Sequence, residues 1–226
     1  MALTIRLRPV PAESVADIDT SSPALAVRRE LRYHLACASV DPWTSIEEFW
    51  VPRTYERADL AVVGSALKAF EIKSERDSLR RLPRQAQAFG RVFDYCTVVL
   101  AGRHLDAAMG LVPGWWGITE VTENGHRTFH EVRQPSLNHT VDATVIVRLL
   151  WREEALAALE AIETLRPVDL RVARSASRAD LWNELLRICS IDDLRKLVRR
   201  ALTRRISTGV RISPFSRRVA SHATGR

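Results

Sequence analysis

Two short apolar runs joined by a glycine-containing turn constrain the fold more than any other part of this sequence. Residues 59–63 (DLAVV) have the continuous apolar character of a buried strand, and residues 67–72 (LKAFEI) alternate between apolar and polar side chains. Gly64-Ser65 lies between the two runs and is typical of a tight turn. The segment therefore predicts an antiparallel β-hairpin.

Hydrophobic periodicity predicts further strands and helices on both sides of this hairpin. Strands are expected at residues 46–51, 95–100, 116–121 and 127–132, and helices at residues 24–38, 79–93, 105–111, 141–165, 181–188 and 191–202. Pro83 is expected to open the second segment of the 79–93 helix, because proline is tolerated in a first helical turn. In the first helix, Arg28, Arg29 and Arg32 fall opposite the leucines. This order of elements predicts an α/β core followed by a helical C-terminal region.

The length of the chain suits one sizeable core with a small appendage, since it has 226 residues of which 46% are hydrophobic. We expect a flexible N-terminal arm at residues 1–23 and the α/β core at residues 24–135. Residues 136–205 are the expected helical region, and residues 206–226 are expected to form a basic, mobile tail.

Cysteine usage and hydropathy favour a cytoplasmic protein that does not enter a membrane. Cys37, Cys96 and Cys189 form no C-x-x-C pair, so we expect reduced thiols rather than a disulfide framework or a structural zinc site. The N-terminus lacks the apolar run of a signal peptide. The apolar stretch at residues 92–102 contains Asp94 and is too short to span a bilayer.

Positive charge is concentrated at the C-terminus. The chain has a formal net charge of +7, and residues 194–226 contain ten Lys or Arg and no acid, which leaves −3 for the first 193 residues. A basic stripe is expected on the last helix, made of Arg195, Lys196, Arg199, Arg200, Arg204 and Arg205. Such charge suits a nucleic-acid partner, and the alternative is a solvated tail that only aids solubility.

The predicted hairpin brings together residues that suit phosphodiester chemistry. Asp59 begins the first strand, and Glu71 and Lys73 end the second on one face, so the three side chains can converge. Two carboxylates and the Ile72 carbonyl could hold a hard divalent cation, and a lysine beside them would stabilise developing negative charge. The alternatives are a surface ion pair between Glu71 and Lys73, and a capped helix start at residues 74–77.

These residues resemble the motif of the PD-(D/E)XK nuclease superfamily, in which an acid is followed on the next strand by acid-x-Lys. The string EIKSERDSLRRLPRQ, with the flanking segments between about residues 25 and 205, resembles an uncharacterised bacterial family within it. The resemblance implies a restriction-endonuclease-like core, a mixed sheet flanked by helices. It also implies an upstream acid at Glu48, with Glu47 as the alternative, and a site glutamine at Gln85. Ala58 replaces the proline of the motif.

Motif and resemblance together predict a metal-dependent nuclease that acts on DNA, with RNA as an alternative substrate. The expected catalytic residues are Asp59, Glu71, Lys73, Glu48 and Gln85. The expected ligands of Mg²⁺ or Mn²⁺ are Asp59, Glu71, Ile72 and Glu48. The alternative function is a catalytically inactive nucleic-acid-binding module on the same fold, and a homodimer is compatible with either function.

Overall fold

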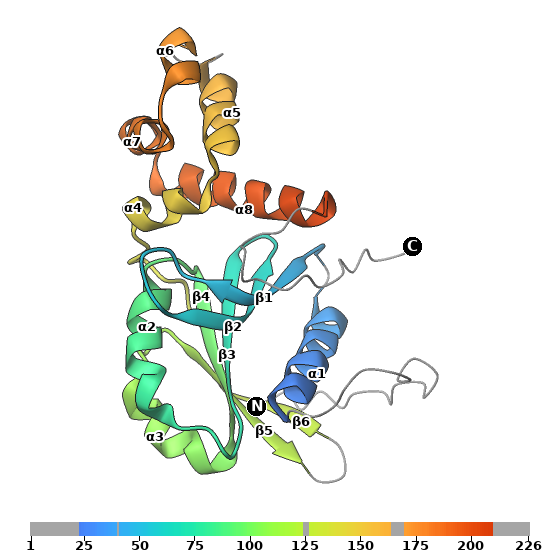
Figure 1. Cartoon of the computed structure of the whole chain (residues 1–226). Coiled ribbons are helices and arrows are strands. Elements are labelled where there is room, and N and C mark those ends of the chain that lie inside the picture. The colour runs from blue at the N-terminus through green and yellow to red at the C-terminus, as the bar shows by residue number, and fades with distance from the viewer. Residues whose placement is uncertain (1–22, 40, 124–126, 164–169, 210–226) are drawn as a thin grey trace.

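The computed structural model describes residues 23–39, 41–123, 127–163 and 170–209, and these form an α/β structure around one six-stranded mixed sheet (Figure 1). The strands are β1 (Thr44–Trp50), β2 (Arg57–Val63), β3 (Leu67–Lys73), β4 (Tyr95–Ala101), β5 (Gly117–Glu123) and β6 (Arg127–Arg133). They lie in the sheet in sequence order. The expected mixed sheet flanked by helices is confirmed.

Strand direction reverses three times across the sheet, between β1 and β2, between β2 and β3, and between β5 and β6. β1, β2 and β3 are antiparallel neighbours, β3, β4 and β5 are parallel, and β6 returns antiparallel to β5. The predicted hairpin is confirmed, because Val63 pairs with Leu67 and the Gly64 N–H donates to the Ala66 carbonyl. β2 begins at Arg57, two residues before the expected start at Asp59.

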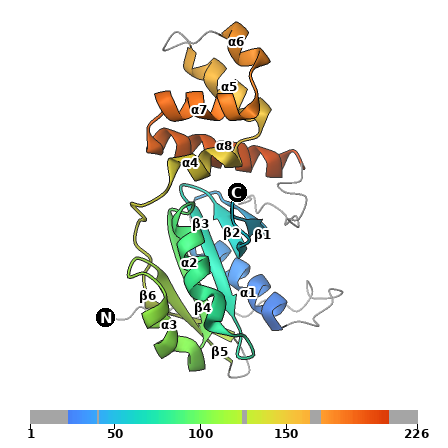
Figure 2. The ribbon, with the colours of Figure 1, turned by 60° about the vertical axis from the view of Figure 1, so that its left-hand side comes forward.

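Helices cover both faces of the sheet. α1 (Pro23–Ala38) packs Val27 and Leu31 onto one face, where they meet Phe70 and Ile72 of β3. α2 (Leu82–Gly90) and α3 (Leu105–Leu111) cover the other face (Figures 1 and 2). A short 3₁₀ turn, η2 (Leu79–Arg81), precedes α2, and a second one, η3 (Gly102–His104), precedes α3. Pro83 lies in the first turn of α2, as predicted.

The helical C-terminal region lies at one end of the sheet (Figure 2). Its elements are α4 (Ala143–Ile146), η4 (Val147–Leu149), α5 (Arg152–Glu163), α6 (Leu170–Ser175), α7 (Arg178–Ile188) and α8 (Ile191–Ser207). The prediction of a single helix at residues 141–165 is wrong, because the chain forms α4, η4 and α5 there. Leu150 adopts an extended backbone (φ −81°, ψ 131°), and the Trp151 N–H donates to Glu154 Oε2. Buried residues occur at helical spacing on both sides of this break, so periodicity could not reveal it.

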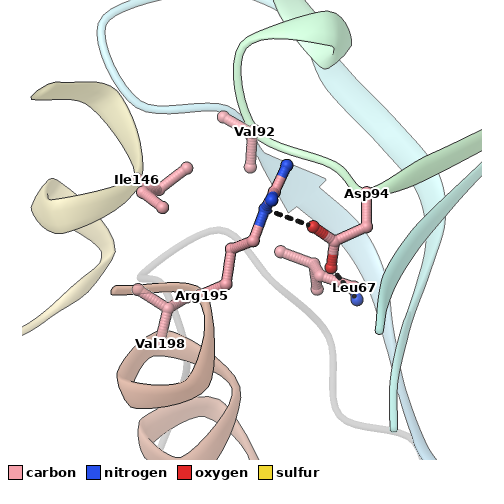
Figure 3. A pocket seen from close by; sticks show the side chains of 6 residues that line it. All are labelled: Leu67, Val92, Asp94, Ile146, Arg195 and Val198. Atoms are coloured by element: carbon pink, nitrogen blue, oxygen red, sulfur yellow. Dashed lines mark hydrogen bonds and ion pairs between the residues drawn. The ribbon is translucent and has the colours of Figure 1, made fainter. Parts of the chain in front are cut away.

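A buried aspartate joins the helical region to the sheet. Asp94, just before β4, accepts a hydrogen bond from the Leu67 N–H at 2.8 Å and lies 2.9 Å from Arg195 Nε of α8. These side chains line a small cavity together with Val92, Ile146 and Val198 (Figure 3). Because the carboxylate contacts both parts, α8 is fixed to the sheet by charge as well as by apolar packing.

The continuous basic stripe expected on α8 is not observed. Arg195 points inward to Asp94, and Arg199 Nη1 lies 3.6 Å from the same carboxylate. Arg205 is buried, binds Glu154, donates to the Leu149 carbonyl at 2.6 Å and stacks over Trp151. α8 packs on more than one side, so half of its expected stripe is structural.

Two expectations fall in part outside the described residues, namely the 1–22 part of the N-terminal arm and the 210–226 part of the basic tail. The structure joins none of the three cysteines in a disulfide. In the described part of the chain, no helix has the length and apolar character needed to cross a membrane.

Candidate functional site

The candidate site lies where the pairing of β2 with β3 stops. The ladder runs from Val63 and Leu67 to Leu60 and Phe70, and in a continued register Asp59 and Glu71 would be the next opposite residues. Instead, the Ile72 N–H donates to Asp59 Oδ2 at 2.7 Å. The Asp59 carboxylate thus takes the place of a backbone carbonyl as the acceptor for the Ile72 N–H. Asp59 and Glu71 both lie where the ladder ends.

Glu71 is at the centre of this site and is almost completely buried. Its Oε1 accepts hydrogen bonds from Lys73 Nζ at 2.7 Å and from Gln85 Nε2 at 2.6 Å. Lys73 Nζ also donates to Gln85 Oε1 at 3.1 Å, which closes a three-membered network. Glu71 Oε2 is buried and has no hydrogen-bond partner among the described residues. A buried oxygen in this state is uncommon in proteins and marks a position that a ligand could satisfy.

Burial controls the protonation of both acids. The pKa of Glu71 is raised to about 7, first by burial and then by the charge of Asp59, against the opposing effects of Lys73 and Gln85. Burial also raises the pKa of Asp59, against the opposing effects of the Ile72 N–H and of Arg28. Near neutral pH the pair therefore holds less negative charge than two exposed carboxylates would, and a nearby cation would favour release of the proton.

An arginine that sequence analysis assigned to the polar face of the first helix joins the upstream acid to this site. Arg28 Nη2 of α1 lies 2.7 Å from Glu48 Oε1 and 3.3 Å from Asp59 Oδ1. Glu48 has a left-handed backbone (φ 56°) and also contacts Arg57. Glu47, the alternative upstream acid, lies 3.6 Å from Arg28 Nη1. Both acids contact Arg28, but only Glu48 contacts the Arg28 Nη2 atom that also contacts Asp59.

The oxygen atoms of the site suit a hard divalent cation. Asp59 and Glu71 supply carboxylates, and the Ile72 carbonyl points to the same strand edge as its N–H, toward Asp59. Arg28 lies against one Asp59 oxygen and Lys73 against one Glu71 oxygen, so part of the donor set already has a counter-charge. The described residues contain no group of three His, Cys, Asp or Glu side chains placed to hold a metal ion. The site therefore offers two side chains and one backbone carbonyl.

The structure brings all five expected catalytic residues to this end of the sheet and adds Arg28, which the sequence did not indicate. Arg28 was missed because its partners are 20 and 31 positions away in the sequence. The capped helix start expected as one alternative at residues 74–77 is absent, because Ser74 and Asp77 form a hydrogen-bonded turn and the next helical turn starts at Leu79. Phe89, four residues after Gln85, is buried and stacks on Trp116 in the core.

Comparison with known proteins identifies a family and one curated relative. The family model described as bacteriophage P4 protein cII matches residues 34–217, which include the five expected catalytic residues and the helical region. Protein cII of Enterobacteria phage P4 is 38% identical over 81 residues, which are 36% of this chain and 31% of the phage protein. The match thus spans about a third of the length of that relative. A solved structure, a protein of unknown function from Silicibacter pomeroyi, covers 66% of this chain and 94% of its own length at 20% identity and a TM-score of 0.43.

Proposed function

The chain belongs to the bacteriophage P4 protein cII family, and we propose that it is a metal-dependent nuclease that hydrolyses phosphodiester bonds. DNA is the proposed substrate and RNA is the alternative. The observation that carries the proposal is the meeting of the buried Glu71 with the partly buried Asp59 beside Lys73. Glu71 Oε2, which has no hydrogen-bond partner among the described residues, is the proposed ligand position for a cation.

The donor atoms favour Mg²⁺ or Mn²⁺. The proposed ligands are Asp59, Glu71 and the Ile72 carbonyl, with Glu48 beside them. When bound, such an ion supplies Lewis-acid polarisation of a phosphoryl oxygen and activation of water. Lys73 holds a positive charge where negative charge develops during hydrolysis. Gln85 orients Glu71 through its hydrogen bond to Oε1, which leaves Oε2 for the ion.

We extend the proposal to the fold and infer a restriction-endonuclease-like core. In support, the two acids lie on the second and third strands of a mixed sheet, and the acid-x-Lys strand β3 is followed by helix α2, which carries Gln85 back to Glu71. Function on such a core depends on the site and not on the architecture alone. The residues of the site therefore carry the functional proposal.

The basic C-terminal helix is the proposed non-specific contact with the nucleic-acid backbone. Because Arg195, Arg199 and Arg205 are turned toward acids of the protein, this contact is left to the exposed residues Lys196, Arg200 and Arg204. Phosphate neutralisation by such side chains is independent of base sequence and weakens with salt.

Cleavage assays test the nuclease directly. We expect the purified full chain to cleave linear, nicked, branched or single-stranded DNA only when Mg²⁺ or Mn²⁺ is present, with RNA assayed in parallel. Asp59→Asn and Lys73→Ala should abolish cleavage, and Glu75→Gln is the matched control because that carboxylate is exposed two residues beyond β3. Cleavage that survives in either of the first two variants would refute the assignment.

One observation favours a second candidate function, a nucleic-acid-binding module without chemistry. The acids of the site already have positive neighbours, because Arg28 contacts Glu48 and Asp59, and Lys73 contacts Glu71. Calorimetric titration with Mn²⁺ separates the two functions. The nuclease requires binding that Asp59→Asn weakens, whereas no binding at millimolar Mn²⁺ would favour the module.

A further inference from the structure

An exposed tyrosine stands on a fixed loop between β1 and β2. Tyr55 is 86% exposed, more than any other large hydrophobic side chain that the structure describes. The loop is held by hydrogen bonds from the Val51 N–H to the Glu56 carbonyl at 3.1 Å and from the Glu56 N–H to Thr54 Oγ1 at 3.1 Å. The exposed ring is thus carried by a turn that hydrogen bonds hold.

The residue after this tyrosine holds two arginines at the start of α2. The buried Glu56 carboxylate lies 2.9 Å from Arg81 Nη2 and 3.1 Å from Arg84 Nη2. The two arginine side chains are 63% and 70% exposed. Two guanidinium groups share one carboxylate, so the three side chains together keep a net positive charge, and the exposed arginines present it to solvent.

The same helical turn connects these arginines to the candidate site. Gln85, the residue after Arg84, donates to Glu71 at 2.6 Å. The hydrogen bond from Arg81 to Glu56 raises the pKa of Arg81, and the charges of Glu71 and Asp59 add to this effect. Arg81 and Arg84 therefore lie on the side of the acids at which α2 begins, and Glu56 ties them to the turn that carries Tyr55. We call Tyr55, Arg81 and Arg84 the rim.

We propose that the rim binds single-stranded nucleic acid, with an unpaired base stacked on Tyr55 and phosphates held by Arg81 and Arg84. An aromatic face next to exposed positive charge is the combination that such strands need, because bases supply flat rings and the backbone supplies anions. In a duplex the base faces are already stacked, so Tyr55 would gain little there. The inference deepens the proposed function and rests on it only for the expectation that the bound strand is also cleaved.

Binding can be measured without cleavage. Fluorescence anisotropy of the full chain in EDTA, with a labelled oligonucleotide of about 16 nucleotides, should show Tyr55→Ala binding about tenfold more weakly than the wild type. Tyr55→Phe should retain wild-type binding, and Tyr33→Ala is the matched control because Tyr33 is also exposed, on α1. Oligomers of deoxyribose and of ribose show whether DNA, RNA or both are held. Wild-type affinity in Tyr55→Ala, or an equal loss with duplex DNA, would overturn the proposal.

The arginines require a variant that keeps Glu56 paired. Arg84→Gln leaves Arg81 on that carboxylate, and it should reduce the slope of log affinity against log salt by about 0.7. Arg187→Gln is the matched control, because Arg187 is similarly exposed and ion-paired on α7. Equal slopes in Arg84→Gln and the wild type would remove the arginines from the proposal. Binding that depends on the rim, with no cleavage, would refute the proposed nuclease activity and support strand binding by the rim. Cleavage with unchanged binding in the rim variants would support the nuclease activity and refute strand binding by the rim.

Discussion

Loss of the Glu71 proton should make the protein less stable as the pH rises. The folded-state pKa of this carboxyl is about 7, against an ordinary value of 4.5. Between these values the folded chain keeps a proton that the unfolded chain has released, so the contribution is present below pH 4.5 and is lost as the pH rises through 7. The difference of about 2.5 pKa units corresponds to about 3 kcal/mol of unfolding free energy.

Glu71→Gln isolates this contribution because the amide does not ionise. We expect the free energy of unfolding of the variant, relative to the wild type, to rise by about 3 kcal/mol between acidic pH and pH 8. Urea denaturation followed by tryptophan fluorescence at a series of pH values measures the difference, and Glu75→Gln is the exposed control. The difference between variant and wild type should be smallest at acidic pH, where both side chains are neutral.

Two results would refute this reasoning. Parallel stability profiles for wild type and Glu71→Gln would mean that burial does not shift the carboxyl in the folded chain. A wild type that gains stability relative to the variant as the pH rises would mean that Lys73 outweighs burial, the reverse of the order found here. Addition of Mn²⁺ at pH 8 should restore stability to the wild type but not to Glu71→Gln, because an ion bound only to the folded state stabilises it.

Three further predictions test the network around the site and the role of α8. Arg205→Met should lower the free energy of unfolding by about 3 kcal/mol, measured by urea denaturation, because it leaves a largely buried carboxylate without its partner; a loss below about 1 kcal/mol, in the range of exposed pairs, would contradict a structural role. Arg28→Met should strengthen Mn²⁺ binding in calorimetry, since it removes the positive charge that lies against two acids of the site; weaker binding would show that Arg28 organises the ligands. The combined substitution of Lys196, Arg200 and Arg204 by Gln should reduce the salt dependence of DNA binding without changing metal affinity, and an unchanged salt slope would remove α8 from the nucleic-acid contact.

Local sequence patterns were sufficient to predict the part of the fold that carries the acids. The apolar runs on either side of Gly64 specify the hairpin, and the spacing of Glu71 and Lys73 specifies which side chains share a face. Pro83 in the first turn of α2 was predictable from the shape of proline alone. These features depend on neighbours within a few residues, which a single sequence shows directly.

Long-range contacts account for what the sequence did not predict. Arg28 has the spacing of a solvent-exposed helical residue, and only the folded chain shows that Glu48 and Asp59 lie beside it. On α8, charge alternates with apolar side chains as on any amphipathic helix, yet Arg205 is buried against Glu154, 51 positions away. A basic residue at helical spacing is therefore assigned to solvent by default, and the assignment fails wherever a distant acid reaches it.

The charge balance of the site argues that its acids serve more than the stability of the fold. Three carboxylates, of Glu48, Asp59 and Glu71, meet three cationic groups, of Arg28, Arg57 and Lys73. These ion pairs range from buried, at Glu71 and Lys73, to partly exposed, at Arg57. Ion pairs across this range give little net stability, and apolar side chains commonly replace buried ones without loss to the fold. The β2–β3 ladder is also interrupted here, at the expense of backbone pairing. Such an arrangement is what the proposed function requires, because a cation ligand could exchange places with one of the internal cations.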